Sequence, residues 1–278
     1  MNVLEAVLFG AVEGLTEFLP VSSTGHLTIL ERLLGFSTDA PDVTAFTAII
    51  QVGAVLATLI YFRNDFRRIV FALVRGLLRP GWRADPDWRF GWAVVLGSVP
   101  IGIVGLLFKD QISTGLRSLW LVAGALVLWS GPMLYADRTA TQKRHEDEVT
   151  RKDTLIIGLA QCLALVPGVS RSGATMSAGL LRGLDRVAVT RLSFFLSVPA
   201  LTAAGLLQAV TEADAVSAGV GWPATLLATA VSFVVAYASI AWLLRYVSRH
   251  SFTVFIVYRV ALGLVLLGLL ASGVVAAT

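Results

Sequence analysis

Long runs of apolar residues, separated by short polar segments, occupy most of the chain. A helix needs about 20 mostly apolar residues (roughly 17–25) to cross the hydrocarbon core of a bilayer. Six runs meet this requirement and predict membrane-spanning helices at residues 43–62, 88–108, 119–135, 190–209, 222–244 and 253–275. Tryptophans lie near the ends of several runs, which is typical of the aromatic belt at a membrane interface.

Two further apolar stretches are interrupted by polar turns. Residues 2–34 are broken at Pro20–Gly25, and residues 154–184 are broken at Pro167–Gly173. Each half of such a stretch, at 1.5 Å per residue, reaches only about 20 Å and is too short to cross alone. One kinked span per stretch is the alternative, but lipid cannot satisfy the polar groups of the breaks. Each stretch is therefore predicted to form a re-entrant helical hairpin.

The distribution of basic residues tests this interpretation, because cytoplasmic loops of membrane proteins are rich in Lys and Arg. Residues 63–89 and 137–153 are strongly basic and are predicted to be cytoplasmic. The loop 109–117 has two basic residues and the loop 212–221 has none, so both are predicted to lie outside. These loop positions all follow the positive-inside rule only if the second broken stretch returns to the cytoplasm near Arg182.

The predicted fold is all-α, a polytopic membrane helix bundle with six spans and two re-entrant helical hairpins. It forms one domain over residues 1–278, in two halves at 1–136 and 154–278 joined by a cytoplasmic linker at 137–153. An odd number of spans per half makes the second half an inverted-topology repeat of the first. Transporters and their relatives use this plan.

Composition supports a membrane protein and argues against other classes. The chain is 56% hydrophobic and 14% charged, whereas soluble domains are about 25% charged. The net charge of +4 does not indicate nucleic acid as a partner, because the basic residues lie between the apolar runs. Residues 67–79 are predicted to form an amphipathic helix on the cytoplasmic membrane surface. Cys162 is the only cysteine, so no intrachain disulfide can form.

The first broken stretch carries two glutamates, a hydroxyl-rich turn and a histidine. Glu13 and Glu17 are four residues apart and so share one helix face. Each charged group costs about 2.5–3.5 kcal/mol at mid-bilayer, which favours a cavity or a bound cation over lipid. The alternative is a structural pair near the interface. A proton-transfer or nucleophilic role is predicted for His26, beside the hydroxyls of Ser22, Ser23 and Thr24.

The second broken stretch carries the matching feature. Arg171 has a planar fork of donors suited to phosphate, and Ser170, Ser172 and Thr175 surround it. A helix following each turn would direct free N–H groups toward an anion. A structural pairing of Arg171 with a glutamate is the alternative. Arg259 lies within a span and is expected to face the interior, with pairing to a carboxylate or binding of substrate equally open.

Together these residues predict a phosphate-binding site with acid–base groups. The two glutamates would repel an anionic substrate unless a divalent cation, Mg²⁺ or Ca²⁺, bridges them. One glutamate could instead act as a general base. The nucleophile stays open among Ser23, His26 and an activated water. A secondary transporter or lipid flippase is the alternative function, since it would use the same inverted plan without chemistry.

The motif at Glu13–His26, Glu-Gly-Leu-Thr-Glu-Phe-Leu-Pro-Val-Ser-Ser-Thr-Gly-His, resembles that of the undecaprenyl-diphosphate phosphatase family, which is associated with bacitracin resistance in bacteria. Ala160–Thr175 is similar to the family's second motif, and the resemblance covers essentially the whole chain. It implies a periplasm-facing site in the bacterial inner membrane that hydrolyses a polyprenyl diphosphate and recycles the peptidoglycan carrier lipid. A homodimer is also possible, because the resemblance does not determine the oligomeric state.

The resemblance also assigns roles to residues. The catalytic positions of the family fall on Glu13, Glu17, Ser23, His26 and Arg171. Ser22, Thr24, Ser170, Ser172 and Thr175 are expected around the phosphates, and a divalent cation is expected at the two glutamates.

Overall fold

The computed structural model describes residues 1–108 and 118–276. The predicted outer loop 109–117 lies outside the described residues. The α-helices are α1 (Val3–Thr16), α2 (Ser23–Leu33), α3 (Pro41–Tyr61), α4 (Arg63–Leu78), α5 (Pro86–Leu107), α6 (Leu119–Thr139), α7 (Arg151–Cys162), α8 (Arg171–Leu181), α9 (Arg186–Thr211), α10 (Ala213–Ala218), α11 (Trp222–Val247) and α12 (Thr253–Ala271).

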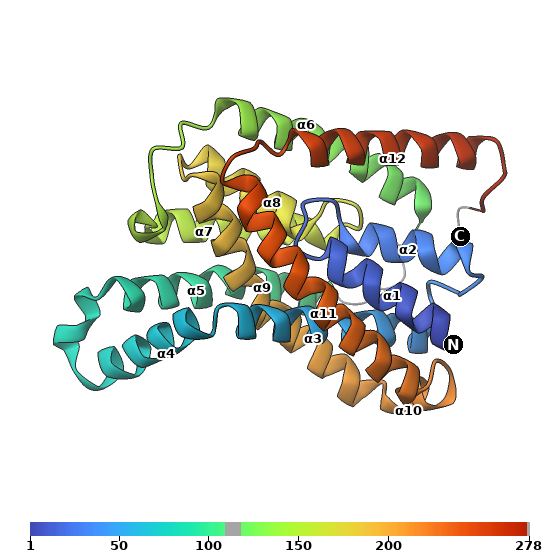
Figure 1. Cartoon of the computed structure of the whole chain (residues 1–278), viewed down its shortest axis with the longest axis horizontal. Helices are drawn as coiled ribbons and strands as arrows, with labels where there is room; N and C mark the ends of the chain where they lie inside the picture. Colours follow the sequence, from blue (N-terminus) through green and yellow to red (C-terminus); the bar gives the residue numbers. More distant parts are fainter. Residues whose placement is uncertain (109–117, 277–278) are drawn as a thin grey trace.

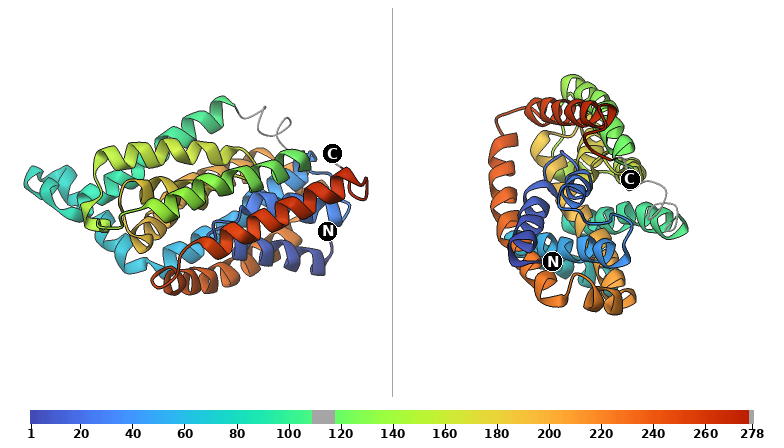
Figure 2. Two further views of the ribbon diagram at one scale, coloured as in Figure 1. Left: turned by 90° about the horizontal axis from the view of Figure 1, so that it is seen from above. Right: turned by 90° about the vertical axis from the view of Figure 1, so that its right-hand side faces the viewer.

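The six predicted spans are confirmed as helices. Within the described residues, α3, α5, α6, α9, α11 and α12 are the six helices long and apolar enough to cross a membrane. No β-strand occurs between residues 1–108 or 118–276. The chain is therefore an all-α polytopic membrane bundle, and Figures 1 and 2 show its long helices packed side by side around α1, α2, α7 and α8.

Each broken stretch forms a hairpin of two short helices. In the second hairpin, Asp153 near the start of α7 pairs with Arg182 just after α8, with 2.7 Å between Oδ1 and Nε. In the first hairpin, Phe36 beyond α2 packs edge-on against Phe9 of α1, with ring centroids 5.7 Å apart. The chain thus enters and leaves each hairpin on the same side, as a re-entrant segment does.

The order of elements repeats along the chain. A hairpin, a long helix, a shorter helix and two long helices occur in α1–α6 and again in α7–α12. The expected division into residues 1–136 and 154–278, with the second half inverted, stays a prediction that this order favours.

Small residues bring the first hairpin into the bundle interior. A Cβ atom added at Gly10 would lie 2.3 Å from the Ala228 carbonyl oxygen, and one at Gly14 would lie 2.5 Å from that of Ser232. Only glycine allows such an approach, and this spacing of small residues is common between helices in membranes. Because α1 packs this closely on α11, Glu13, which lies between the two glycines, is fully buried.

The linker is tied to the second hairpin by ion pairs. The Asp153 carboxylate is buried and also binds Arg144, with 2.6 Å between Oδ2 and Nη2. Burial alone raises the pKa of Asp153, but hydrogen bonds from Arg144 and Thr150 outweigh this and hold the pKa well below its usual range. Asp137 pairs likewise with Arg186 at 2.8 Å. The basic loops therefore gather at one end of the bundle.

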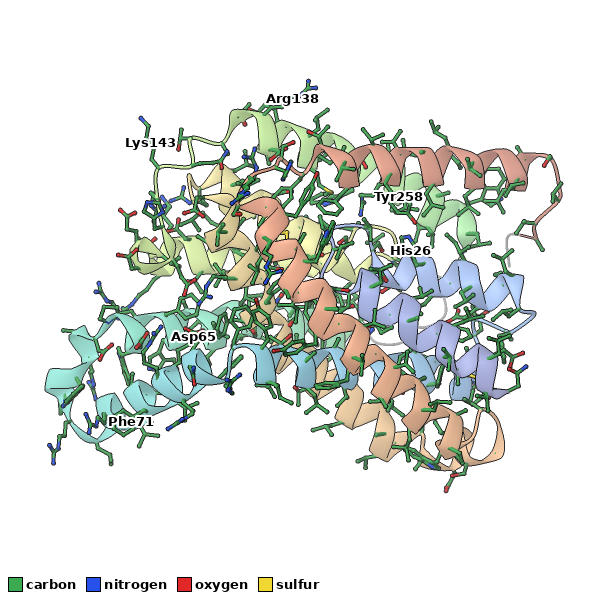
Figure 3. All side chains as sticks on the ribbon, in the orientation of Figure 1. His26, Asp65, Phe71, Arg138, Lys143 and Tyr258 are labelled. Atoms are coloured by element: carbon green, nitrogen blue, oxygen red, sulfur yellow. The ribbon has the colours of Figure 1, made fainter. Side chains whose placement is uncertain are left out.

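The predicted amphipathic helix is present as α4 and begins earlier than expected, at Arg63. It buries Ile69, Ala72 and Gly76 on the side that contacts α5. Its opposite side exposes apolar residues, including Phe71, which Figure 3 labels. The position of this face on the membrane surface stays a prediction.

Candidate active site

The two polar turns, far apart in the sequence, meet inside the bundle. Ser172 Oγ of the second turn donates a hydrogen bond to the carbonyl oxygen of Leu19, the residue just before the first turn, at 2.9 Å. Arg259 of α12 spans both turns, donating to the Gly168 carbonyl at 2.8 Å and to the Pro20 carbonyl at 3.4 Å. We call the two turns the first elbow (Pro20–Gly25) and the second elbow (Pro167–Gly173).

The elbows have the same local geometry. Ser22 and Ser170 have φ of 75° and 78°, which is rare for residues other than glycine. Each is the N-cap of the following helix, and its side chain accepts a hydrogen bond from the glycine N–H three residues on, at 3.3 Å from Gly25 and 3.1 Å from Gly173. Such strained backbone costs about 1–3 kcal/mol and often occurs at functional sites.

This equivalence places one functional side chain at the first position of each short helix. Ser23 opens α2 and Arg171 opens α8. Both side chains bind the same carboxylate: Ser23 Oγ donates to Glu17 Oε2 at 2.6 Å, and Arg171 Nη2 donates to Glu17 Oε1 at 2.9 Å. Glu17 thus joins the hydroxyl of one elbow to the guanidinium of the other.

Arg171 is fixed by hydrogen bonds, but one of its donors has no partner in the part of the chain that the structure describes. Its Nη1 donates to the Ser193 carbonyl of α9 at 3.0 Å, while its buried Nε has no hydrogen-bond partner among the described residues. Buried polar groups in native proteins usually have a partner, so an unpaired donor at an elbow indicates a place for water or ligand.

Glu13 also has buried polar atoms without a donor in the described part of the chain, here on an acidic side chain. The residue is fully buried, and no hydrogen-bond donor among the described residues contacts either carboxylate oxygen. An unpaired buried carboxylate is costly, so it must be protonated or matched by a cation. Two free oxygens suit a hard cation such as Mg²⁺ or Ca²⁺.

The remaining hydroxyls in and just after the second elbow stabilise it through hydrogen bonds. Ser170 Oγ lies 3.1 Å from Ser172 Oγ, and Thr175 Oγ1 lies 2.8 Å from Ser193 Oγ. In the first elbow, Thr24 differs from its neighbours because it is exposed. All ten predicted residues therefore lie within or beside the elbows; nine are buried or half-buried, and Thr24 is exposed.

His26 lies one turn into α2 and does not contact Glu17 or Arg171. Its Nδ1 is 2.7 Å from the Ser22 carbonyl oxygen, and its Nε2 is 2.7 Å from the hydroxyl of Tyr258. Figure 3 shows His26 and Tyr258 near the middle of the bundle, away from the end that carries Lys143 and Asp65. His26 is thus attached to the first elbow through Ser22.

Sequence reasoning missed two contributors and the partners of a third. Ser193 and Tyr258 had no predicted role, since a single polar residue in a span has no distinctive pattern. Arg259 was expected to face the interior, and it is completely buried. It donates hydrogen bonds to two backbone carbonyls and to Ser130 Oγ rather than to the carboxylate that was one of its expected partners.

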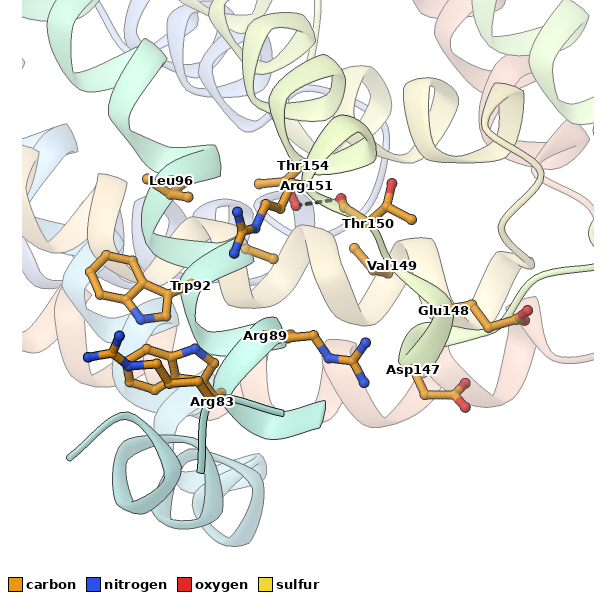
Figure 4. Close-up of a pocket in the computed structure, with 12 residues that line it drawn as sticks. Arg83, Arg89, Trp92, Leu96, Asp147, Glu148, Val149, Thr150, Arg151 and Thr154 are labelled. Atoms are coloured by element: carbon orange, nitrogen blue, oxygen red, sulfur yellow. Dashed lines mark hydrogen bonds between the residues drawn. The ribbon is translucent and has the colours of Figure 1, made fainter. Parts of the chain in front are cut away.

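A cavity of about 670 Å³ lies elsewhere, between α5 and the segment that leads into α7 (Figure 4). Its lining includes Arg83, Arg89, Arg151 and Trp92, and none of the predicted site residues. It lies at the basic end of the bundle. The elbows are therefore recognised by their paired and unpaired polar groups rather than by this cavity.

The six apolar helices make the chain a multi-pass membrane protein. Its two helical hairpins enclose a buried polar site with acidic and basic side chains. The family model described as bacitracin resistance protein BacA matches residues 6–265, and the chain belongs to this family. It is 71% identical to Undecaprenyl-diphosphatase 3 of Frankia casuarinae over 278 residues, which is 100% of both chains.

Two other relatives are similar over nearly their whole length. The chain is 54% identical to Undecaprenyl-diphosphatase of Cutibacterium acnes, with 100% of both chains covered. It is also 54% identical to Undecaprenyl-diphosphatase 1 of Streptomyces coelicolor, with 99% of this chain and 98% of the relative covered. The predicted family is confirmed.

Proposed function

We propose that the chain hydrolyses undecaprenyl diphosphate to undecaprenyl phosphate and inorganic phosphate, and so recycles the carrier lipid of peptidoglycan synthesis. Its relatives are named for a diphosphatase of this lipid. The observation that carries the mechanism is the Glu17 carboxylate, which contacts both a hydroxyl and a guanidinium. In this proposal, the Ser23 hydroxyl is the nucleophile, the Glu17 carboxylate is the base and the Arg171 guanidinium binds phosphate.

Ser23 is the nucleophile in this mechanism. Its hydroxyl already donates to a carboxylate, which is how serine nucleophiles are activated. Attack of Oγ on the terminal phosphorus passes the hydroxyl proton to Glu17. The bond from that phosphorus to the bridging oxygen breaks, and undecaprenyl phosphate leaves with the bonding electrons. The protein then carries phosphoserine at position 23.

Arg171 holds the phosphoryl group during this transfer. In the structure its fork binds the Glu17 carboxylate and the Ser193 carbonyl, and phosphate oxygens are stronger acceptors of the same geometry. The unpaired Nε donor adds a further contact. When substrate arrives, Arg171 exchanges Glu17 for phosphate, which frees the carboxylate to act as a base. Fixed donors of this kind stabilise the charge of phosphoryl transfer.

Water completes the reaction. It attacks the phosphorus of phosphoserine, the bond to Ser23 Oγ breaks, and inorganic phosphate leaves. Glu17 returns its proton to Oγ. We assign to His26 the proton that the water loses, because the ring lies one turn from Ser23, and the imidazole then releases this proton to solvent. Imidazole suits such a transfer near neutral pH.

Glu13 would hold a divalent cation, together with Glu17 until the Glu17 carboxylate takes up the Ser23 proton. The unpaired oxygens of Glu13 fit this role. No group of three or more His, Cys, Asp or Glu side chains in the described residues is arranged to hold a metal, so the substrate phosphates and water would complete the ligands, as is usual for Mg²⁺. A bound cation supplies charge neutralisation between the carboxylates and the diphosphate.

The chain is a multi-pass membrane protein, and we place it in the bacterial cell membrane with the elbows open to the periplasm or cell exterior. The basic loops at one end of the bundle support a cytoplasmic position for that end. A polyprenyl tail would then stay in the lipid while its diphosphate reaches the elbows from the outer side.

Phosphate release separates this enzyme from a flippase, which moves lipid without breaking a bond. Purified protein in detergent with a short polyprenyl diphosphate and Mg²⁺ should release inorganic phosphate. Glu17→Gln should lower kcat at least about 100-fold, because general base catalysis contributes typically 10²–10⁴-fold.

Glu5→Gln is the matched control, since Glu5 lies on the same helix and only caps its first turn. This control should keep the wild-type rate. Absence of phosphate release by the wild-type protein would contradict the proposed function, and a fully active Glu17→Gln variant would contradict the role of Glu17.

A further inference from the structure

The hydrogen bond between His26 and Tyr258 joins an elbow to the last span. Tyr258 O–H lies 2.7 Å from His26 Nε2, and the two rings are stacked with 10° between their planes and 5.6 Å between centroids. The residues are separated by 232 positions in the chain. Tyr258 lies on α12, and the mechanism above does not use it.

The partners of His26 determine which ring nitrogen carries the proton. Nδ1 lies 2.7 Å from a backbone carbonyl oxygen, and a carbonyl can only accept. Nδ1 must therefore be the protonated nitrogen of the neutral ring. Nε2 then has a lone pair, so the Tyr258 hydroxyl donates to it. The contacts of both nitrogens thus select one tautomer.

A hydroxyl has a property at this position that no carboxylate or guanidinium shares. It can donate to a bare nitrogen and accept from a protonated one. A proton reaches Nε2 through this hydroxyl, which gives its own hydrogen to Nε2 and takes one from water. The Ser22 carbonyl then keeps its bond to Nδ1–H, and the Tyr258 oxygen accepts from Nε2–H. The imidazole can therefore change protonation state without losing either partner or turning its ring.

The position of Tyr258 is itself fixed relative to both elbows. The next residue, Arg259, is completely buried and binds the Pro20 and Gly168 carbonyls. A lipid-facing tyrosine serves most often as an interfacial anchor. Tyr258, which is 45% exposed, instead has its hydroxyl directed to an elbow histidine.

We infer that Tyr258 is a positioning residue for His26: it holds the imidazole in the Nδ1–H tautomer and in one orientation, and the transferred proton reaches Nε2 through its hydroxyl. This inference rests on the proposed function only for the catalytic use of His26. The tautomer and the hydrogen bond can be tested without any activity.

The first experiment reads the tautomer. The chain has three histidines, so protein labelled with ¹⁵N-histidine gives few ring signals in detergent, and the signal that His26→Gln removes belongs to His26. Ring ¹⁵N shifts should report the Nδ1–H tautomer in the wild-type protein and a mixture of tautomers in Tyr258→Phe. An Nε2–H tautomer in the wild type, or an unchanged His26 signal in Tyr258→Phe, would overturn the inference.

The second experiment measures turnover. Tyr258→Phe keeps the stacked ring and removes one hydrogen bond, so kcat should fall about 10-fold, the size expected for roughly 1.4 kcal/mol. KM should change less than about twofold, since the substrate is not contacted. Tyr237→Phe is the matched control: Tyr237 lies on α11 with its ring against Tyr61, and this variant should keep the wild-type kcat.

A double variant separates positioning from general loss of packing. His26→Gln with Tyr258→Phe should be no slower than His26→Gln alone, because Tyr258 acts only through His26. An additive loss, or wild-type kcat in Tyr258→Phe, would overturn the inference. A wild-type protein that releases no phosphate would instead contradict the proposed function, and the ring signals of His26 would still decide the tautomer.

Discussion

The two elbows share a backbone conformation, but the charged residues in or beside them have opposite signs. In both, a serine with positive φ caps a short helix and accepts a bond from a glycine three residues on. The residue after this serine is Ser23 in the first elbow and Arg171 in the second. The first elbow follows two glutamates, whereas the second presents a guanidinium. The same turn geometry thus occurs twice in the chain, and the chemistry is divided between the two turns.

This division has an electrostatic reason. A diphosphate and two carboxylates repel one another strongly in a low-dielectric interior, and an unpaired charge there is costly. Arg171 offsets one carboxylate directly, at 2.9 Å from Glu17. Glu13 has no such partner in the described residues. The comparison therefore predicts unequal consequences when the charges are removed one at a time.

The largest effect is expected at the charge of the second elbow. Arg171→Ala should lower kcat about 10²–10³-fold, because it removes the main donors to the phosphoryl group and leaves the Glu17 carboxylate unpaired. Arg171→Lys keeps the charge without the planar fork and should recover only part of the rate. The rate of phosphate release is measured with purified variants that insert and purify in the same amounts as the wild type. Near wild-type turnover of Arg171→Ala would refute the assigned role.

A smaller and different effect is expected at Glu13. Glu13→Gln keeps the shape of the side chain and removes one carboxylate from the proposed cation site. The Mg²⁺ concentration for half-maximal activity should rise at least about 10-fold, since affinity depends on the number of charged ligands. Titration of activity with Mg²⁺ tests this, with Glu5→Gln as the control. Superimposable titration curves would exclude Glu13 as a ligand.

The smallest effect is expected at the caps, and it should be equal in the two elbows. Ser22→Ala and Ser170→Ala each lose one side-chain cap, which is worth about 1 kcal/mol. Glycine at either position should cost less, because it adopts positive φ without strain. Thermal unfolding in detergent compares the four variants. A marked difference between Ser22→Ala and Ser170→Ala would contradict the equivalence of the elbows.

The sequence predicted much of the fold because apolar runs and polar breaks are strong signals in membrane proteins. All six spans and both hairpins follow from the rule that lipid cannot satisfy polar backbone. The positive-inside pattern then fixed the second hairpin as re-entrant, and the pairing of Asp153 with Arg182 agrees with it. The contact of Glu17 with Arg171 was given only as the structural alternative to phosphate binding by Arg171, and no pattern links the two segments.

Other features could not be read from the chain. Tyr258 looks like one more aromatic residue in an apolar span, and its partner is 232 positions away. Arg259 binds two carbonyl oxygens, and every residue of the chain has a carbonyl. The opposite roles of Ser22 and Thr24, one buried as a cap and one exposed, depend on the turn conformation, which hydroxyl content alone does not determine.

The bond of Arg259 to both elbows has a consequence for biogenesis. Helix α12 comes after both hairpins along the chain, so the ribosome makes the elbows long before the arginine that joins them. A nascent chain that has inserted only α1–α11 has every proposed catalytic side chain but lacks this link between the turns. The protein is therefore expected to gain activity at the final insertion step, and unfinished copies in the membrane should leave the lipid pool untouched.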